Sequence, residues 1–421
     1  MKGIFMKALI AMSGGVDSSV AASLMQERGW DCVGCTMKLF ENPDAGAAAD
    51  KTCCSLDDVE DARGVARRLG MPYYVFNFTE EFRERIIGHF IEEYLAGRTP
   101  NPCIDCNRFM KFGKLLDRAR VLGCDAVVTG HYARIRFDGE RYHLLRGLDP
   151  GKDQSYVLYD MTQDQLAHTL FPLGELTKEE VRRLAEARGF LNAHKPDSQD
   201  ICFVPDGDYG AVITAHTGRT PEPGDFVDAD GRVLGRHRGI LYYTVGQRKG
   251  LGLSLPAPLY VIRIDPEKNQ VVLGPSEALF RRDVTVRNFR WISGEAPAGP
   301  VEGQAKLRYR QPPAPVTAFP QDDGSLLLSF AEPQRAPTPG QSAVLYQGEE
   351  VLGGGIIEST EACEERQESV CDSYQNGVEI QILGDAATNP CPYSVIRAFQ
   401  FFCHNSVLLM SLLMLLDVLL Y

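Results

Sequence analysis

The pattern of apolar and polar positions divides this chain of 421 residues into two regions with different periodicity. Up to about residue 200, short apolar runs alternate with stretches in which apolar residues recur every three or four positions. Strands that alternate with helices are typical of a doubly wound parallel α/β sheet. The predicted strands are 8–12, 32–37, 73–76 and 126–129, and the predicted helices are 17–25, 55–69, 79–94, 109–122 and 177–188.

Helix caps and loops support this reading. Asp17 and Ser18 stand at the predicted start of the first helix, where they suit an N-cap. Ser55 with Asp58 forms a short-armed capping box, and Thr177 with Glu180 forms a regular one. The stretches 41–51 and 97–108 are predicted to be loops.

From about Pro205 onward the helical period fades, and short β-like runs lie between Gly, Pro and Asp residues. Such spacing predicts small antiparallel barrels. The runs are 224–227, 240–245, 259–264, 270–273, 304–309, 326–330 and 342–346. We therefore expect domains at 1–206, 207–280 (small, central and β-rich) and 281–358 (a β-barrel), followed by an atypical tail at 359–421.

The last 63 residues differ from the rest, with no Lys, four Cys and an apolar ending at 407–421 that Asp417 interrupts. A membrane-spanning helix needs about 20 apolar residues, so the run of 15 favours a disordered or loosely docked appendage over an anchor. The first six residues carry no signal-peptide pattern. We expect a cytoplasmic protein without a membrane partner.

The net charge of −12 by itself argues against a nucleic-acid partner, but the distribution of the charges changes this conclusion. The tail alone holds eight acidic and two basic residues, so it contributes half of the net negative charge. The stretch 231–252 holds five basic residues and no acid, and a further seven basic residues follow between 281 and 310. A phosphate-binding surface on the later domains is therefore compatible with the acidic total.

The stretch from Ala11 to Ser18 is the strongest chemical signal. A buried strand leads into two glycines, an acidic residue and two hydroxyls at the start of a helix. This arrangement presents free backbone N–H groups and a positive helix end to a phosphate. The Gly-Lys-Ser/Thr ending of a Walker A loop is missing. The motif instead resembles the PP-loop of ATP pyrophosphatases, although an ordinary Gly-rich turn between strand and helix is the simpler alternative.

Two further stretches carry cysteines in polar surroundings. Cys103 and Cys106 are three residues apart in a loop with two prolines, followed by Arg108 and Lys111. A helix N-terminus and nearby cations lower thiol pKa values and favour the thiolate. A zinc half-site is the alternative, but no second C-x-x-C follows. Cys202 follows Asp, Ser and Gln in the stretch 197–201, which predicts a turn rather than core.

Together these stretches closely resemble the bacterial tRNA-specific 2-thiouridylase (MnmA) family, from about Lys7 to Gly355. The resemblance rests on 11–18, 37–38, 101–107, 129–133, 151–156, 197–202, 246–252, 308–309, 339–341 and 353–355. It implies a PP-loop domain, a central domain and a C-terminal β-barrel. It also implies an enzyme that uses ATP and Mg²⁺ to adenylate the C2 oxygen of the wobble uridine (position 34), which sulfur then replaces to give 2-thiouridine, AMP and pyrophosphate.

The resemblance also implies roles for individual residues. The ATP contacts would be Ala11, Met12, Ser13, Gly14, Gly15, Val16, Asp17, Ser18, Met37 and Gly130, with Asp17 placing the metal. Cys202 would carry a persulfide received from a cysteine desulfurase or a sulfur-relay protein, and Cys106 would be the nucleophile, with a Cys106–Cys202 disulfide as intermediate. Asn101, Pro102 and Cys103 would surround the target base. The tRNA contacts would be His131, Lys152, Asp153, Gln154, Arg308, Tyr309 and Gln341. His131 is equally compatible with a satisfied core histidine, and Arg308 with a solvated strand residue.

One position departs from the family pattern, because many members carry Asp where this chain has Cys103. Cys103, Cys106 and Cys202 could ligate three irons of a 4Fe–4S cluster and leave the fourth open for sulfide. Persulfide chemistry is the preferred alternative.

Two other functions fit parts of the sequence. A PP-loop ligase or amidotransferase that adenylates a small metabolite would share the loop but would need no cysteine pair. A non-catalytic tRNA-binding module would not need Asp17, Cys106 and Cys202 together.

Overall fold

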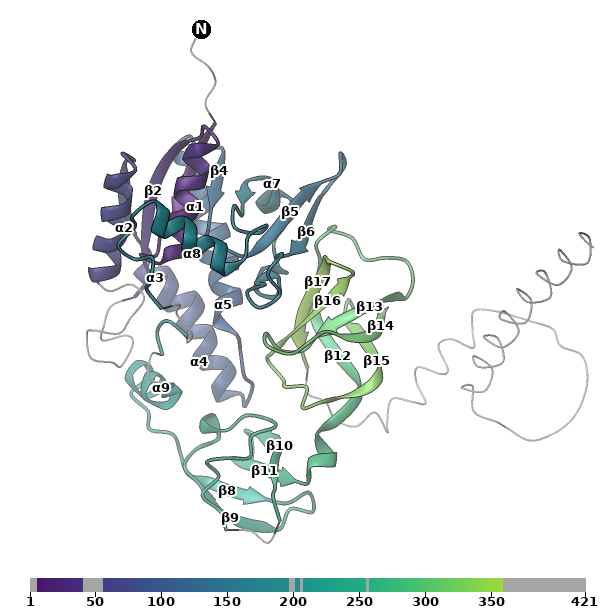
Figure 1. Cartoon of the computed structure of the whole chain (residues 1–421). Helices are drawn as coiled ribbons and strands as arrows, with labels where there is room; N and C mark the ends of the chain where they lie inside the picture. The colour runs from purple at the N-terminus through teal and green to yellow at the C-terminus, as the bar shows by residue number, and fades with distance from the viewer. Residues whose placement is uncertain (1–5, 41–55, 197–200, 205–206, 255–256, 359–421) are drawn as a thin grey trace, which may run out of the picture. The chain divides into compact units, whose positions relative to one another are not determined.

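The computed structural model describes residues 6–40, 56–196, 201–204, 207–254 and 257–358 (Figure 1). Predictions for the loop at 41–51, for Ser55 and for the tail at 359–421 lie outside these residues. No helix within the described ranges is long and apolar enough to cross a membrane.

A parallel sheet forms the first part of the chain and confirms the predicted fold class. It has five strands in the order β3-β2-β1-β4-β7, and each neighbouring pair is parallel. The central strand β1 is apolar and wholly buried from Ala8 to Ile10. The strands are β1 (Lys7–Ala11), β2 (Asp31–Lys38), β3 (Tyr73–Asn77), β4 (Ala126–Val128) and β7 (Thr169–Leu170).

Helices cover both faces of this sheet because alternate residues of β1 point to opposite sides. Ala8 and Ile10 pack with α1 (Val16–Glu27), α2 (Leu56–Arg68) and α8 (Lys178–Ala187). Leu9 packs with α6 (Leu115–Val121) on the other face. The sheet is therefore doubly wound, as its sequence pattern predicts.

The first helix begins at Val16, with Gly15 as a cap that makes no side-chain capping bond. The predicted cap at Asp17 and Ser18 is therefore wrong. The Ser18 hydroxyl donates to the carbonyl of Gly15 at 3.0 Å, so it closes the turn from inside the helix. The capping box of Thr177 and Glu180 is confirmed at the start of α8.

The predicted helix at 79–94 is present as α3 (Thr79–Phe82), a π-helical turn (Arg83–Ile87) and α4 (Gly88–Leu95). The predicted loop 97–108 is wrong in its second half. Helix α5 (Pro102–Asp105) continues into a π-helix, Cys106–Lys114, and then into α6. Asn101 caps α5 by accepting from the N–H of Cys103 at 3.2 Å, and Pro102 suits the first helical position because it has no N–H to satisfy.

The central part holds α9 (Tyr209–Thr217) and a four-stranded sheet of order β10-β11-β8-β9. The expectation of purely antiparallel pairing is wrong here, because β11 pairs with β8 in parallel. The predicted strand at 240–245 is a short 3₁₀ turn, Ile240–Tyr242, whose segment divides its apolar residues among three clusters. The strands are β8 (Gly224–Val227), β9 (Val233–His237), β10 (Tyr260–Asp265) and β11 (Gln270–Gly274).

The predicted C-terminal barrel is confirmed. Its strands run antiparallel in the order β12-β15-β14-β13-β16-β17, and a β12–β17 pairing closes the ring. A hairpin that the sequence pattern missed, β5 (Ala133–Phe137) with β6 (Tyr142–Arg146), extends this sheet through β17. The domain boundaries stay a prediction, since this hairpin joins the barrel's sheet. The barrel strands are β12 (Phe280–Trp291), β13 (Val301–Lys306), β14 (Ala314–Pro320), β15 (Leu326–Arg335), β16 (Ser342–Gln347) and β17 (Glu350–Ile357).

Candidate active site

The Gly-rich turn after β1 is fastened by hydrogen bonds between its own residues. The N–H of Ser13 donates to the Ser18 hydroxyl at 3.3 Å, and the Ser19 hydroxyl donates to the carbonyl of Gly15 at 3.0 Å. Gly14 has a φ of +74°, and a Cβ there would lie 2.4 Å from the carbonyl oxygen of Asp58. Only glycine satisfies both conditions, so the loop conformation is specified by this position.

Asn192 supports the same loop, and the sequence analysis did not identify it. Its buried side-chain NH₂ donates to the carbonyl of Gly14 and to the Ser19 hydroxyl, both at 2.9 Å. No local motif marks Asn192, because it reaches the loop from the segment after α8.

Gly130, which is a predicted ATP contact, lies against the start of α1. A Cβ on Gly130 would lie 2.9 Å from the backbone carbon of Asp17 and 3.0 Å from the nitrogen of Ser18. The ends of β1 and β4 therefore meet at one edge of the sheet, which is where open α/β sheets bind ligands.

Asp17 already has two partners. Lys178 places its ammonium 2.8 Å from both carboxylate oxygens, and the Tyr132 hydroxyl donates at 2.8 Å. Among the residues that the structure describes, no group of three or more His, Cys, Asp or Glu side chains could hold a metal ion. Asp17 thus fastens the loop to α8, and the protein side chains around it do not form a resident metal site.

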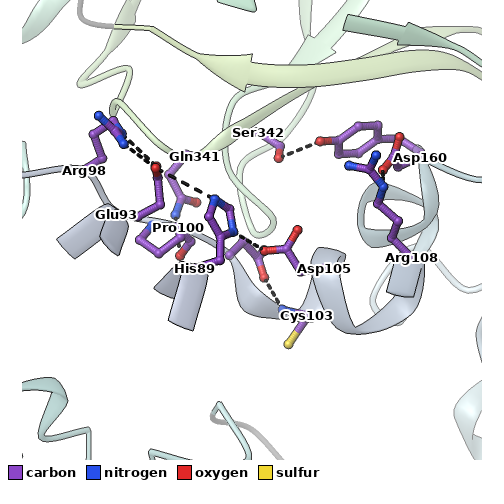
Figure 2. Close-up of polar contacts among 12 residues, drawn as sticks. His89, Glu93, Arg98, Pro100, Cys103, Asp105, Arg108, Asp160, Gln341 and Ser342 are labelled. Atoms are coloured by element: carbon purple, nitrogen blue, oxygen red, sulfur yellow. Dashed lines mark hydrogen bonds and ion pairs between the residues drawn. The ribbon is translucent and has the colours of Figure 1, made fainter. Parts of the chain in front are cut away.

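The segment that carries Cys103 and Cys106 is held by polar contacts on both sides (Figure 2). The His89 ring nitrogen Nδ1 lies 2.8 Å from the Asp105 carboxylate, whose hydrogen bond raises the pKa of His89. At the start of the segment, Arg98 pairs with Glu93. The Cys103 side chain is exposed, but desolvation by surrounding atoms raises the pKa of its thiol, against the opposing charge of Lys111.

Cys106 and Cys202 come from distant parts of the chain and pack against one apolar cluster. Met37, from the end of β2, contacts the same cluster. Phe203 anchors the segment that carries Cys202. Its buried ring packs edge-on against the rings of Phe82 and Phe90, whose centroids are 5.7 and 5.1 Å away. The structure thus brings both predicted thiols and one predicted ATP contact to one cluster.

The barrel holds the cysteine-bearing segment through the loop before β16. The N–H of Thr99 donates to the carbonyl of Pro339 at 2.8 Å, and the Gln341 side chain donates to the carbonyl of Thr99 at 2.7 Å. The next residue, Ser342, places its hydroxyl 3.2 Å from the hydroxyl of Tyr159. In this conformation Gln341, predicted to touch tRNA, positions the turn that leads to Cys103.

A buried carboxylate, which the sequence analysis also did not identify, ties the barrel to the helix that carries Cys103 and Cys106. This helix, α5 with the π-helix Cys106–Lys114, is called the thiol helix below. Asp160 lies 2.9 Å from Nε of Arg108 and 3.1 Å from Nε of Arg290 on β12. Burial raises the pKa of Asp160, and the two guanidinium groups act against that rise. A buried Asp that holds two arginines fixes both elements at once.

The other predicted tRNA contacts also have protein partners. Asp153 accepts from the N–H groups of Gly147 and Ser155, at 3.1 and 3.0 Å, and Gln154 accepts from the N–H of Tyr132 at 3.0 Å. These bonds shape the loop that presents Lys152, which is partly exposed.

Arg308 donates to the carbonyls of Val245 and Ala336, at 3.0 and 3.1 Å, and to the Thr338 hydroxyl at 2.6 Å. Tyr309 is half-buried against Tyr156, with ring centroids 5.9 Å apart. Arg308 is therefore not the solvated strand residue that the sequence left open.

His131 is buried between Phe112 and Phe171. Its Nδ1 lies 2.6 Å from the Thr129 hydroxyl, and its Nε2 lies 3.5 Å from the Lys111 ammonium. This is the satisfied core histidine that the sequence left as an alternative, and its role in tRNA binding stays a prediction.

The parallel sheet and its fastened Gly-rich turn define an ATP-utilising protein of the PP-loop class. Residues 6–206 match the family model described as tRNA methyl transferase HUP domain. Residues 210–275 match the tRNA methyl transferase PRC-barrel domain, and 281–357 match the aminomethyltransferase beta-barrel domain.

Three relatives carry the name tRNA-specific 2-thiouridylase MnmA. The chain is 52% identical to that of Moorella thermoacetica, over 83% of this chain and 99% of the relative. It is 49% identical to that of Acetivibrio thermocellus (84% and 99%) and 48% identical to that of Clostridium perfringens (84% and 98%). The chain belongs to the tRNA-specific 2-thiouridylase family.

Proposed function

We propose that this protein is an ATP-dependent tRNA 2-thiouridylase that replaces the C2 oxygen of the wobble uridine with sulfur. The observation that carries the proposal is the shared cluster of Met37, Cys106 and Cys202. Met37, from the end of the strand next to β1, and the two thiols from distant segments all pack against this cluster, which supports a common site. A ligase for a small metabolite would have no use for the thiols.

The first step is adenylation. The uridine C2 oxygen attacks the α-phosphate of ATP, the bond to pyrophosphate breaks, and the uridine N3 proton leaves to water. The loop from Ala11 to Ser18 supports this step, since its N–H groups and the N-terminus of α1 suit an anionic triphosphate. The oxygen then departs from C2 as AMP, which is a far better leaving group than oxide.

The second step delivers sulfur from a persulfide on Cys202. Cys106 attacks the inner sulfur of that persulfide, hydrosulfide is released, and a Cys106–Cys202 disulfide forms. Hydrosulfide attacks C2 of the adenylated uridine, and AMP leaves with the electron pair of the C2–O bond. A dithiol reductant then restores both thiols, and a cysteine desulfurase or a sulfur-relay protein reloads Cys202.

The target base must leave the anticodon stack to reach these groups. Asn101, Pro102 and Cys103 are our candidates for its surroundings, because Cys103 is exposed at the start of the thiol helix. The basic stretch of the central domain, with Arg236 and Arg238, would hold the phosphate backbone. Since charged tRNA is used in the cytoplasm, we place the reaction there.

The residues around the site also bear on the two candidate cofactors, Mg²⁺ and an iron-sulfur cluster. Mg²⁺ would enter with ATP and would take most of its ligands from phosphates and water. Within the described part of the chain, Cys103, Cys106 and Cys202 do not form a group that could hold a metal ion. We therefore favour the persulfide route, and anaerobic purification with iron and sulfide analysis would overturn it by finding a cluster in active protein.

Nucleoside mass analysis of tRNA incubated with the protein, ATP and a sulfur donor tests the proposal. We expect 2-thiouridine with the wild type and none with Cys106→Ser or Cys202→Ser, although ATP binding persists. Cys124→Ala is the control, since Cys124 is a buried cysteine of a different apolar cluster, the one under α6. Full thiolation by both serine variants would favour a ligase, and absence of tRNA-dependent pyrophosphate release would favour a binding module.

A further inference from the structure

A lysine on the thiol helix connects the two halves of the site. Lys111 lies five residues after Cys106, in the π-helix Cys106–Lys114. Because backbone hydrogen bonds of a π-helix join residues five apart, Lys111 stands one turn beyond Cys106. Its charge also acts on the Cys103 thiol.

The other end of this connection is His131, which follows Gly130 in the chain. Gly130 touches the backbone of Asp17 and Ser18, so His131 is adjacent to the ATP loop. The Lys111 ammonium lies 3.5 Å from Nε2 of His131. Lys111 is therefore linked to the phosphate-binding loop through His131, and it shares a helix with Cys106.

The protonation of His131 is fixed by its surroundings. Burial, and then the charge of Lys111, lower the pKa of His131 well below its ordinary value, so the ring is neutral. An ammonium group can only donate, so in its 3.5 Å contact with Lys111 the Nε2 atom is the acceptor, and we assign the ring proton to Nδ1. Nδ1 then donates to the Thr129 hydroxyl at 2.6 Å. His131 is thus a fixed acceptor that aims the Lys111 ammonium.

We propose that Lys111 is a catalytic residue that binds the α-phosphate of ATP and of the adenylated uridine, and that His131 is its positioning residue. This inference rests on the proposed function. The phosphate of the adenylated base must lie between the loop that bound ATP and the thiols that supply sulfur. It gains negative charge when AMP leaves, so a fixed cation stabilises that transition state more than the ground state.

Single-turnover kinetics with ATP, sulfur donor and unmodified tRNA test the role of Lys111. Lys111→Met should slow pyrophosphate release and 2-thiouridine formation about a hundredfold, as removal of one charge-stabilising donor does. The dissociation constants for ATP and tRNA should change less than about threefold. Lys114→Met is the matched control, because Lys114 lies on the same helix and pairs with Glu81 at 3.1 Å.

Two substitutions of His131 separate positioning from simple packing. His131→Phe keeps a ring between Phe112 and Phe171 but removes the acceptor, and it should slow the same steps about tenfold. His131→Gln keeps an acceptor near Nε2 and should recover most of the rate.

The proposal would be overturned if the rates of pyrophosphate release and 2-thiouridine formation in Lys111→Met stayed within about threefold of wild type. It would also be overturned if His131→Phe weakened tRNA binding while leaving the rate at saturating tRNA unchanged, because His131 would then contact tRNA itself. If Lys111→Met does not fold, the same rates are measured for Lys111→Arg, His131→Phe and His131→Gln, and these variants test the proposal instead. A wild type without tRNA-dependent pyrophosphate release would instead refute the proposed function, whatever the variants do.

Discussion

The ATP loop and the thiol site are built in different ways. The loop is almost complete within nine residues of chain, since the hydroxyls of Ser18 and Ser19 bond the carbonyl of Gly15. The thiol site takes Cys106 from a π-helix, Cys202 from a distant turn and its restraints from the barrel. The loop closes on itself and takes outer support from Asn192 and Lys178, whereas the thiol site has no such local framework and depends on every element that meets there.

The largest expected effect comes from Gly14→Ala, which disrupts the conformation of the ATP loop. The substitution forces a Cβ into the carbonyl of Asp58 at a φ of +74°. We expect a loss of about a hundredfold or more in ATP-dependent activity and about 2 to 4 kcal/mol in stability, because backbone cannot give way as a side chain can.

Isothermal titration with ATP and urea unfolding measure both effects of Gly14→Ala. Gly64→Ala is the control, since a Cβ at Gly64 in α2 meets nothing within 4 Å and should be neutral or stabilising. Unchanged ATP affinity in Gly14→Ala would mean that the backbone conformation at Gly14 does not define the ATP site.

Asp160→Asn tests how far the thiol site depends on contacts between distant elements. It removes the charge that Arg108 and Arg290 share, and we expect a loss of about 2 kcal/mol in the free energy of unfolding, below the range for fully buried pairs. Thiolation should fall while ATP affinity persists, because the thiol helix loses its tie to the barrel. Asp164→Asn is the control, as its pair with Arg120 is exposed. Equal stability of the two variants would contradict this view.

Gln341→Leu should have a smaller effect on the thiol site than Asp160→Asn. It removes the donor to the carbonyl of Thr99, and one neutral hydrogen bond contributes about 1 kcal/mol. We expect slower thiolation, with tRNA affinity unchanged, because the turn before Cys103 loses a restraint. Gln347→Leu, at a long 3.4 Å contact on an exposed strand end, is the control. A pure loss of tRNA affinity in Gln341→Leu would instead support the tRNA contact that the family resemblance implies.

The smallest effect is a pH dependence at the junction between hairpin β5–β6 and the barrel. Burial lowers the pKa of His143, but hydrogen bonds to Asp138 and Glu350, both at 2.7 Å, outweigh it and leave the pKa raised. The stabilisation is therefore fully present below the unfolded-state pKa of about 6.5 and is lost as pH rises through the folded-state value.

Urea unfolding from pH 5.5 to 8.5 measures this dependence on His143. His143→Gln should flatten the profile in that window, and His168→Gln, whose ring is exposed, should leave it as in wild type. A wild-type stability that rises with pH over the same window would contradict the assignment.

The sequence by itself determined the parallel sheet, the barrel and the ATP loop. Each depends on information that is local in the chain: the apolar runs of the strands, the capping box at Thr177, and two glycines with hydroxyls at the start of a helix. It also marked the two catalytic cysteine candidates through short motifs.

Only the tertiary structure decided which side chains support those motifs. Asn192, Asp160 and Lys178 reach the site across the fold, so no spacing in the sequence reveals them. The burial of His131 depends on Phe112 and Phe171, which come from other elements. Hydrogen bonds and ion pairs between distant segments are set by how elements pack, and sequence periodicity carries information only about each element's own faces.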